Sequence, residues 1–178
     1  MVEIRLVETF DKAAVAALTE PIFGDAARRA YFDALVGPQA VARQTALCES
    51  LPHPSRVRVG AFDGDRLVGA SSGWFEGPNF YIGMSAVEPA YRRQGLYTGL
   101  LHQLEQTVRL RGGALIHSHH VATNNAVLIA KLKLGYVICG VEFVESMGLL
   151  VHLTLHLDPE RKALFTTRTG TLRPDIAP

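Results

Sequence analysis

The strongest local pattern of the chain is the stretch VEPAYRRQGLYTGLL at positions 87–101. The apolar run that ends at Val87 predicts a strand, and Pro89 closes it because proline cannot donate a hydrogen bond to a sheet ladder. From Leu100 onward, apolar residues recur at helical spacing as far as Gly112. The stretch therefore predicts a strand, a short loop and a helix in succession.

The loop between this strand and this helix has the features of a phosphate site. Backbone N–H groups at the start of a helix lack intrahelical partners, and the positive end of the helix dipole lies there. Gly95 lets the backbone approach an anion closely, and Arg92 and Arg93 can add charge-assisted hydrogen bonds. We expect the ligand to carry a phosphate or a pyrophosphate.

Two common phosphate-binding signatures are absent from this stretch. It contains no GxxxxGK[ST], and Gly95 with Gly99 does not form GxGxxG, which disfavours nucleoside triphosphates and dinucleotides. The stretch instead resembles the signature of the GNAT superfamily of N-acetyltransferases, which places [QR]xxGx[GA] between a strand and a helix. Arg92 and Gly95 meet that signature, whereas Tyr97 stands where glycine or alanine is usual.

A second block, NNAVLIAKLKLGY at positions 124–136, is similar to a later helix and strand of the same superfamily. In that family an asparagine opens the helix and a glycine closes it eleven residues later, and Asn124 and Gly135 have this spacing. Lys131 occupies the position at which many members carry a tyrosine that protonates the departing thiolate. The two blocks together extend the resemblance over residues 56–143.

The resemblance implies a fold, a reaction and a cosubstrate. We expect an α/β fold with three layers, α/β/α, around a central mixed and mostly antiparallel sheet. A primary amine would attack the thioester of acetyl-coenzyme A directly, without a metal, and a backbone N–H near residues 85–87 would stabilise the oxyanion. The residues implied to bind the cofactor are Ser85, Ala86, Val87, Arg92, Arg93, Gln94, Gly95, Leu96, Tyr97, Thr98, Asn124 and Lys131.

The reaction needs a group that takes a proton from the amine. Deprotonating an amine with a pKa near 10.4 at pH 7 costs about 4.6 kcal/mol. Candidate acceptors are His117 and His119 on one face of a predicted strand, His120 on its other face, and Glu76 acting through water. Tyr81 stands where some family members carry a catalytic glutamate. We take His119, Tyr81 and Glu76 as the expected catalytic residues, with His119 as the preferred base.

Turn and cap residues divide the rest of the chain into further strands and helices. Asp11 is a predicted N-cap, and Gly64 a predicted hairpin turn that makes residues 56–62 and 66–75 antiparallel neighbours. Other predicted strands cover residues 2–7, 80–87, 114–121, 136–143 and 149–157, and other helices cover 11–20, 25–36, a stretch ending near 50, and 124–134. We expect one GNAT-like domain at 1–157 and a C-terminal tail at 158–178, either disordered or packed on a partner.

The composition is that of an ordinary globular domain. Of 178 residues, 48% are apolar and 20% charged, and 18 basic against 17 acidic residues leave a net charge of +1, so no strong field attracts nucleic acid or an anionic membrane. The longest charge-free stretch, 112–130, is too polar to span a membrane, and we expect a cytoplasmic protein. The expected partner is a small-molecule or peptide amine, and the apolar late strands make a homodimer reasonable.

Two other interpretations stay open. Lys131 and Tyr81 replace a family tyrosine and glutamate, which favours a noncatalytic acyl-CoA-binding or sensing module. His117, His119 and His120 could be metal ligands, but no further ligand at a fixed offset completes a site, so we expect ordinary histidines and no metal.

Overall fold

The computed structural model describes residues 2–169, except for the side chain of Asp25. The strands are β1 (Val2–Leu6), β2 (Arg56–Asp63), β3 (Arg66–Glu76), β4 (Asn79–Val87), β5 (Leu115–Val121), β6 (Val137–Val144) and β7 (Gly148–His156). The helices are α1 (Lys12–Phe23), α2 (Asp25–Val36), α3 (Pro38–Ser50), the single 3-10 turn η1 (Pro89–Tyr91), α4 (Leu96–Leu110), α5 (Asn125–Lys133) and α6 (Pro159–Arg168).

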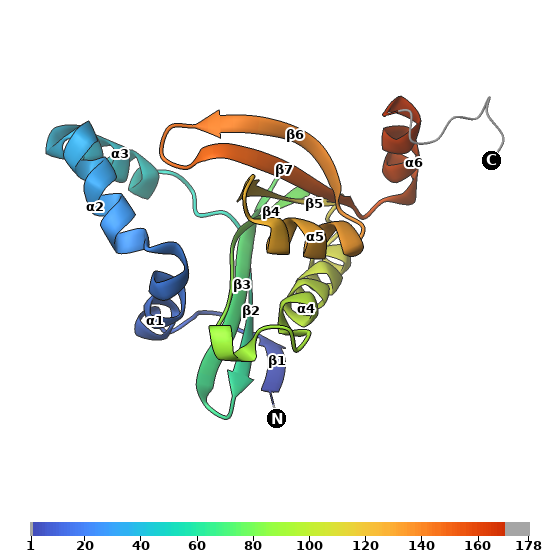
Figure 1. Ribbon diagram of the computed structural model, residues 1–178. Coiled ribbons are helices and arrows are strands. Elements are labelled where there is room, and N and C mark those ends of the chain that lie inside the picture. Colours follow the sequence, from blue (N-terminus) through green and yellow to red (C-terminus); the bar gives the residue numbers. More distant parts are fainter. Residues whose placement is uncertain (1, 170–178) are drawn as a thin grey trace. The chain divides into compact units, whose positions relative to one another are not determined.

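The strands form one mixed sheet in the order β1-β2-β3-β4-β5-β7-β6. Strands β4 and β5 are parallel, whereas the pairs β1–β2, β2–β3, β5–β7 and β6–β7 are antiparallel. A parallel pair needs a crossover, and η1 with α4 supplies it between β4 and β5. The predicted α/β class with a mixed, mostly antiparallel sheet is confirmed (Figure 1).

The chain divides into two compact units. The first contains the residues up to Phe75 together with Gly83–Leu104, and the second contains Glu76–Ile82 together with the residues from Glu105 onward.

In the first unit, helices lie on both faces of the sheet. Leu18 of α1 packs against Ala70 of β3, whereas a Cβ added at the neighbouring Gly69 would lie 3.3 Å from Leu100 Cδ1 of α4. Because successive residues of a strand point to opposite faces, α1 and α4 cover opposite sides of β3. Helix α4 packs closely against β1, since a Cβ added at Gly99 would lie 2.5 Å from Ile4 Cδ1. This arrangement gives the unit the predicted three layers.

In the second unit, β7 lies between β5 and β6. His119 of β5 is directly opposite His152 of β7, and His152 is directly opposite Gly140 of β6. Buried apolar residues such as Leu153 and Ile116 hold these strands together. The register therefore places polar side chains of three adjacent strands on one face of the sheet.

Several predicted caps and turns are confirmed by the backbone. The carboxylate of Asp11 accepts a hydrogen bond from Ala14 N at 2.8 Å at the start of α1. Gly64 has the positive φ of 60° that the hairpin requires, and Gly135 ends α5 with a φ of 87°. Helix α2 spans the predicted residues 25–36.

Two elements differ from the prediction. Helix α1 continues through Pro21 to Phe23. A proline in the last turn removes only one hydrogen bond, so the helix ends later, where Gly24 provides a left-handed C-cap. From the sequence we predict no element within residues 158–178, but the structure shows α6 there. Its start is fixed by Asp158, whose carboxylate accepts from Glu160 N at 2.8 Å. The rest of the predicted tail, 170–178, lies outside the described residues.

Across residues 2–169, no helix has both the length and the hydrophobicity required to cross a membrane.

Candidate functional site

The loop between β4 and α4 has the backbone geometry of an anion site. After β4, the turn η1 leads to Arg92, and α4 begins at Leu96. Arg93 and Gly95 have left-handed backbones, with φ of 61° and 80°. Left-handed residues in a turn can direct neighbouring N–H groups to one side, as in the nests that bind anions. A Cβ added at Gly95 would meet no atom within 4 Å, so the space beside this glycine is open.

The first turn of α4 supplies further donors. Gly99 N donates to Gly95 O at 2.9 Å, which is the first hydrogen bond of the helix. The N–H groups of Leu96, Tyr97 and Thr98 therefore have no acceptor within the helix. The positive end of the helix dipole lies at the same place, and negative charge is stabilised there.

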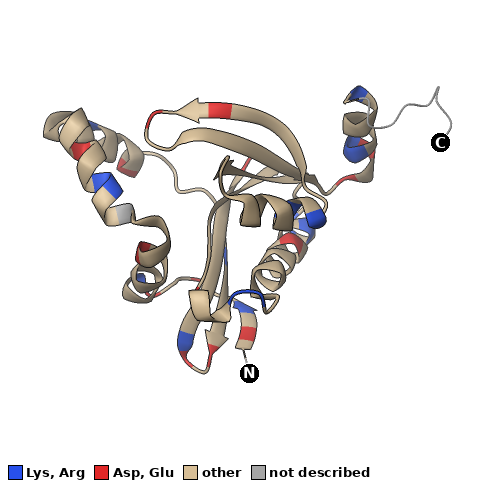
Figure 2. Ribbon diagram, in the orientation of Figure 1, with Lys and Arg blue, Asp and Glu red and all other residues tan. Residues whose placement is uncertain are grey.

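Two arginines stand beside these donors. Arg92 Nε donates to Val87 O at 3.1 Å, which holds the guanidinium near the end of β4. The side chains of Arg92 and Arg93 are exposed. Figure 2 shows this basic segment immediately before α4. The loop thus combines backbone donors with two exposed positive charges.

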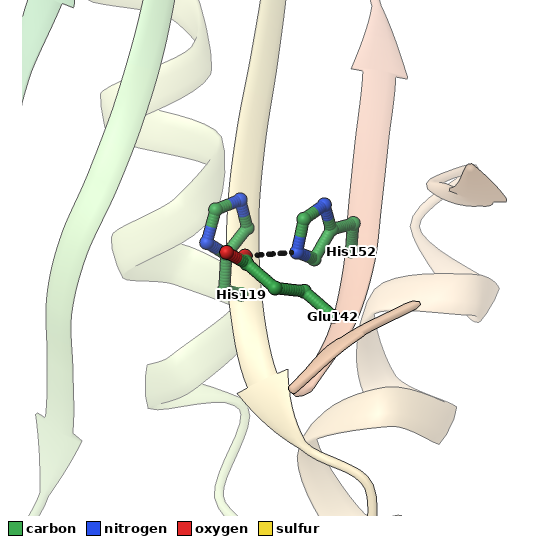
Figure 3. Close-up of side chains that lie close together, drawn as sticks. All are labelled: His119, Glu142 and His152. Carbon is green, nitrogen blue, oxygen red and sulfur yellow. Dashed lines mark hydrogen bonds and ion pairs between the residues drawn. The ribbon is translucent and has the colours of Figure 1, made fainter. Parts of the chain in front are cut away.

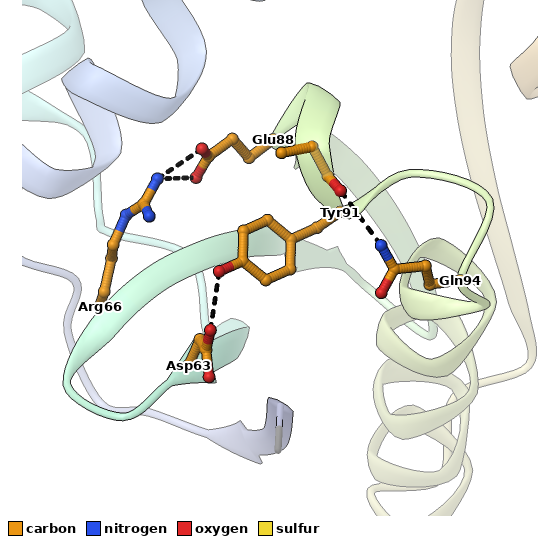
Figure 4. Close-up of polar contacts among 6 residues, drawn as sticks. Asp63, Arg66, Glu88, Tyr91 and Gln94 are labelled. Carbon is orange, nitrogen blue, oxygen red and sulfur yellow. Dashed lines mark hydrogen bonds and ion pairs between the residues drawn. The ribbon is translucent and has the colours of Figure 1, made fainter.

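Side chains of the β2–β3 hairpin brace the loop (Figure 4). The Tyr91 hydroxyl donates to Asp63 Oδ2 at 2.7 Å, and Glu88 forms an ion pair with Arg66. Gln94 Nε2 donates to a backbone oxygen of η1 at 3.1 Å. The predicted cofactor residue Gln94 therefore has a structural role in shaping the loop.

The end of β4 offers backbone rather than side chains. Ala86 and Val87 are buried, and the hydroxyl of Ser85 lies 2.8 Å from that of Ser71. These side chains are thus packed or hydrogen-bonded within the first unit. Backbone groups here suit the predicted contact with the thioester oxygen.

Tyr97 fills the position at which the family signature has a small residue. Its hydroxyl is buried and has no hydrogen-bond partner among residues 2–169. Burial raises the pKa of this phenol above its ordinary value. The ring therefore packs into the first unit with its hydroxyl turned away from solvent.

The second unit contains the predicted residues of the second block. Asn124 caps α5, because its side-chain oxygen accepts from Val127 N at 3.4 Å. Lys131 is completely buried, its Nζ lies 2.5 Å from Ser118 Oγ, and it lies 4.5 Å from the centre of the Tyr136 ring. Burial lowers the pKa of this amine from 10.5 to about 7.

The predicted catalytic residues come together on one face of β5. The ring centre of Tyr81 lies 5.2 Å from those of both His117 and His119, and these two imidazoles lie 6.0 Å apart. His117 Nε2 lies 3.3 Å from Glu76 Oε2. His120 instead contacts Ser118, with Nε2 3.0 Å from Oγ.

The environment of His117, His119 and Tyr81 favours neutral imidazoles and a protonated phenol. Burial lowers the pKa of His117 and His119, and the neighbouring His152 lowers that of His119 further. Burial and the charge of Glu76 raise the pKa of Tyr81. Burial also lowers the pKa of His120 to about 3. Neutral imidazoles can accept a proton or bind a metal ion.

Two residues of this face were not predicted from the sequence. The His152 ring stacks on that of His119 with centres 3.8 Å apart and planes 9° apart, and His152 Nε2 lies 2.9 Å from Glu142 Oε2 (Figure 3). The alternation of 149–157 gives the face on which His152 lies, but the register that puts it opposite His119 depends on strand pairing.

A separate hollow of about 620 Å³ lies beside α2 and α3 in the first unit. Its lining contains Arg29, Asp33, Glu49 and Arg56 and none of the predicted site residues. Charges of both signs give it no preference for one class of ligand.

Comparison with known proteins agrees with this geometry. The family model described as the acetyltransferase (GNAT) family matches residues 23–136. No curated protein matches the sequence significantly.

Solved structures share the fold. The ribosomal-protein-S18-alanine N-acetyltransferase from Escherichia coli is 16% identical with a TM-score of 0.66, covering 89% of this chain and 95% of its own. An aminoglycoside 6'-N-acetyltransferase complexed with coenzyme A is 17% identical with a TM-score of 0.62, covering 88% and 98%. A structure from Bacillus anthracis described as a putative streptothricin acetyltransferase, in complex with acetyl-coenzyme A, is 22% identical with a TM-score of 0.54, covering 62% of this chain and 67% of its own.

The family match covers more than half of the chain, and the phosphate-type loop lies within it. The chain therefore belongs to the GNAT family and is an acetyl-CoA-dependent N-acetyltransferase.

Proposed function

We propose that the enzyme transfers the acetyl group of acetyl-coenzyme A directly to the primary amine of a small molecule or peptide, with His119 as the proton acceptor. One observation supports this choice of base. His117, His120 and His152 are paired with Glu76, Ser118 and Glu142, respectively. Among residues 2–169, the ring nitrogens of His119 have no hydrogen-bond partner. Its lone pair is therefore available to an incoming amine.

Glu76 and Tyr81 act through their neighbours in this proposal. Glu76 orients His117, whose ring packs beside the ring of His119. Tyr81 lies against both imidazoles, those of His117 and His119, and borders them on one side. Both are positioning residues, because they set where the His119 ring lies.

The cofactor's pyrophosphate is assigned to the loop from Arg92 to Thr98. The open space at Gly95, the N–H groups at the start of α4 that have no acceptor within the helix, and the exposed arginines support this assignment. The backbone at 85–87 is assigned to the thioester.

Acetyl transfer can be tested without knowing the acceptor. Purified protein is incubated with acetyl-coenzyme A and a panel of aminoglycosides, polyamines, amino acids and peptides with a free N-terminal alanine. Release of free thiol with matching acetylated product on any acceptor supports the enzyme. Stabilisation by acetyl-coenzyme A without product on the whole panel would instead favour the noncatalytic binding module.

A homodimer is also proposed, formed through the β6–β7 hairpin. Strand β6 is an edge of the sheet. Four apolar side chains of the hairpin are 48–77% exposed: Ile138, Val141 and Phe143 of β6 and Leu149 of β7. Exposed apolar residues grouped on one edge favour association with another chain. Analytical ultracentrifugation should give a dimer for the wild type and a monomer for Phe143→Ser. A wild-type monomer at high concentration would contradict the proposal.

A further inference from the structure

Three side chains from three adjacent strands converge on the sheet face of the second unit. His119 comes from β5, His152 from β7 and Glu142 from β6, and their nearest ligand atoms all lie within 4.8 Å of one another (Figure 3). His119 and His152 are direct cross-strand partners, and Glu142 is diagonal to His152, because His152 is opposite Gly140. The backbone therefore fixes all three positions.

The neighbourhood leaves room for a ligand at this cluster. Gly140 has no side chain opposite His152, and a Cβ built there would lie 3.9 Å from His152 Nδ1. The side chains of Glu142 and His152 are 49% and 26% exposed. An ion can thus reach the cluster from solvent, and the Glu142 side chain can rotate.

A simple ion pair accounts for only part of this arrangement. The contact between His152 and Glu142 satisfies two of the three groups. It leaves the ring nitrogens of His119, the direct cross-strand neighbour of His152, without a hydrogen-bond partner among residues 2–169. A shared ligand would use the donor atoms of all three residues.

We propose that His119, Glu142 and His152 bind one divalent transition-metal ion, with Zn²⁺ as the best match. Two imidazoles and one carboxylate form a known zinc donor set, and three protein ligands leave a fourth position for water. Ideal tetrahedral geometry puts donor atoms about 3.3 Å apart. The His119 and His152 rings, whose planes are 9° apart in the stacked arrangement, must therefore tilt so that both nitrogen lone pairs point at the ion, and Glu142 must rotate toward it.

The ion inhibits acetyl transfer rather than assisting it. The imidazole lone pair of His119 that bonds to the metal cannot also accept the proton of the amine. This second part of the inference rests on the proposed function, in which His119 is the base. Metal binding itself does not depend on it.

Binding is tested on the full chain with Co²⁺ and Zn²⁺. The wild type should bind one Co²⁺ with the intense visible absorption of a four-coordinate site, and Zn²⁺ should displace it. Glu142→Gln and His152→Ala should each weaken Zn²⁺ binding at least about tenfold, the loss that even an outer-shell partner can cause. Glu142→Gln changes an exposed side chain and should stay folded. The control His53→Ala removes an exposed histidine outside the cluster and should bind like the wild type.

The absence of a stoichiometric site, or equal loss in the His53→Ala control, would overturn the metal proposal. Inhibition is measured as initial rates of acetylated product by mass spectrometry, because thiol reagents compete for zinc. Zn²⁺ should lower the wild-type rate at least tenfold, with half-inhibition at the zinc concentration that half-fills the site, and Glu142→Gln should need at least tenfold more. Full occupancy without inhibition would overturn the inhibitory role and remove His119 as the base, while the binding site would stand. Catalysis that depends on His119 without any zinc binding would leave the proposed function intact and refute only the metal site.

Discussion

Lys131 Nζ and Ser118 Oγ lie 2.5 Å apart in the interior of the second unit, where Lys131 is completely buried. Ser118 Oγ also lies 3.0 Å from His120 Nε2, so three polar groups form one chain that begins in the interior and ends at the half-buried His120. Burial lowers the pKa of Lys131 to about 7, and the amine is therefore only partly charged near neutral pH. The residue at the family's tyrosine position is thus a buried amine tied to β5.

The buried amine predicts a pH dependence of stability. Between pH 7 and 10.5 the unfolded chain keeps the proton on Lys131 whereas the folded chain has lost it. The unfolded state then binds more protons, so the free energy of unfolding rises with pH across this window. Urea unfolding at several pH values should show that rise in the wild type. It should be reduced in Lys131→Met, which keeps the volume without the charge, and an unchanged pH slope in that variant would contradict the shifted amine.

Replacing His119 tests the proposed base. His119→Gln should lower kcat about 10²- to 10⁴-fold, the contribution typical of a general base. The KM for acetyl-coenzyme A should stay near the wild-type value, because the loop assigned to the pyrophosphate is unchanged. His120→Gln, on the opposite side of β5, serves as the control. If His120→Gln loses as much activity as His119→Gln, the assignment of the base is wrong.

Glu76 and His117 should behave as positioning residues. Glu76→Gln keeps the size of the side chain but removes the charge that faces His117. We expect kcat to fall about tenfold or less, which is below the roughly 10²- to 10⁴-fold contribution of a general base itself, with KM for acetyl-coenzyme A unchanged. Steady-state kinetics with one saturating acceptor measures this. A loss as large as that of His119→Gln would make the Glu76–His117 pair the base instead.

Arg92 should contribute to cofactor affinity. A hydrogen bond to a charged group is worth about 1.5–3 kcal/mol, so Arg92→Ala should weaken acetyl-coenzyme A binding about 10- to 100-fold. Isothermal titration calorimetry at fixed salt gives the affinity. Arg43→Ala, which removes the same charge from α3, should leave it within about twofold. Unchanged affinity in Arg92→Ala would refute this role.

Gly95 should contribute both to the stability of the loop and to the binding of acetyl-coenzyme A. Its φ of 80° makes Gly95→Ala cost about 1–2 kcal/mol of stability, and the added Cβ should weaken acetyl-coenzyme A binding more than tenfold. Gly112→Ala at the other end of α4 has nearly the same φ, 79°, and the same open space. This control should lose similar stability and no affinity. Equal affinity in the two variants would place the pyrophosphate elsewhere.

Local signals predicted much of the fold. Three residues, Gly64, Gly135 and Asp11, have the backbone conformation or the capping contact that their residue types favour. The sequence alone therefore located the ends of the strands and helices next to them. The start of α6 has a comparable signal in the Asp158–Pro159 pair, which the irregular pattern of the following residues hid. Local chemistry thus sets the elements.

Long-range pairing sets the site. Period-two alternation predicted that His117 and His119 share a face, and the structure adds Tyr81 to both. Which residue of β7 lies opposite His119, and which residue of β6 reaches it, depends on strand register and on the shift between Ile138 and Gly140. No local pattern of residues encodes that register.

The most direct measurement is a crystal structure of the protein with coenzyme A bound. We predict the diphosphate oxygens within hydrogen-bond distance of backbone N–H groups between Gly95 and Thr98, beside Arg92. A nucleotide bound elsewhere on the protein, with this loop empty, would contradict the account.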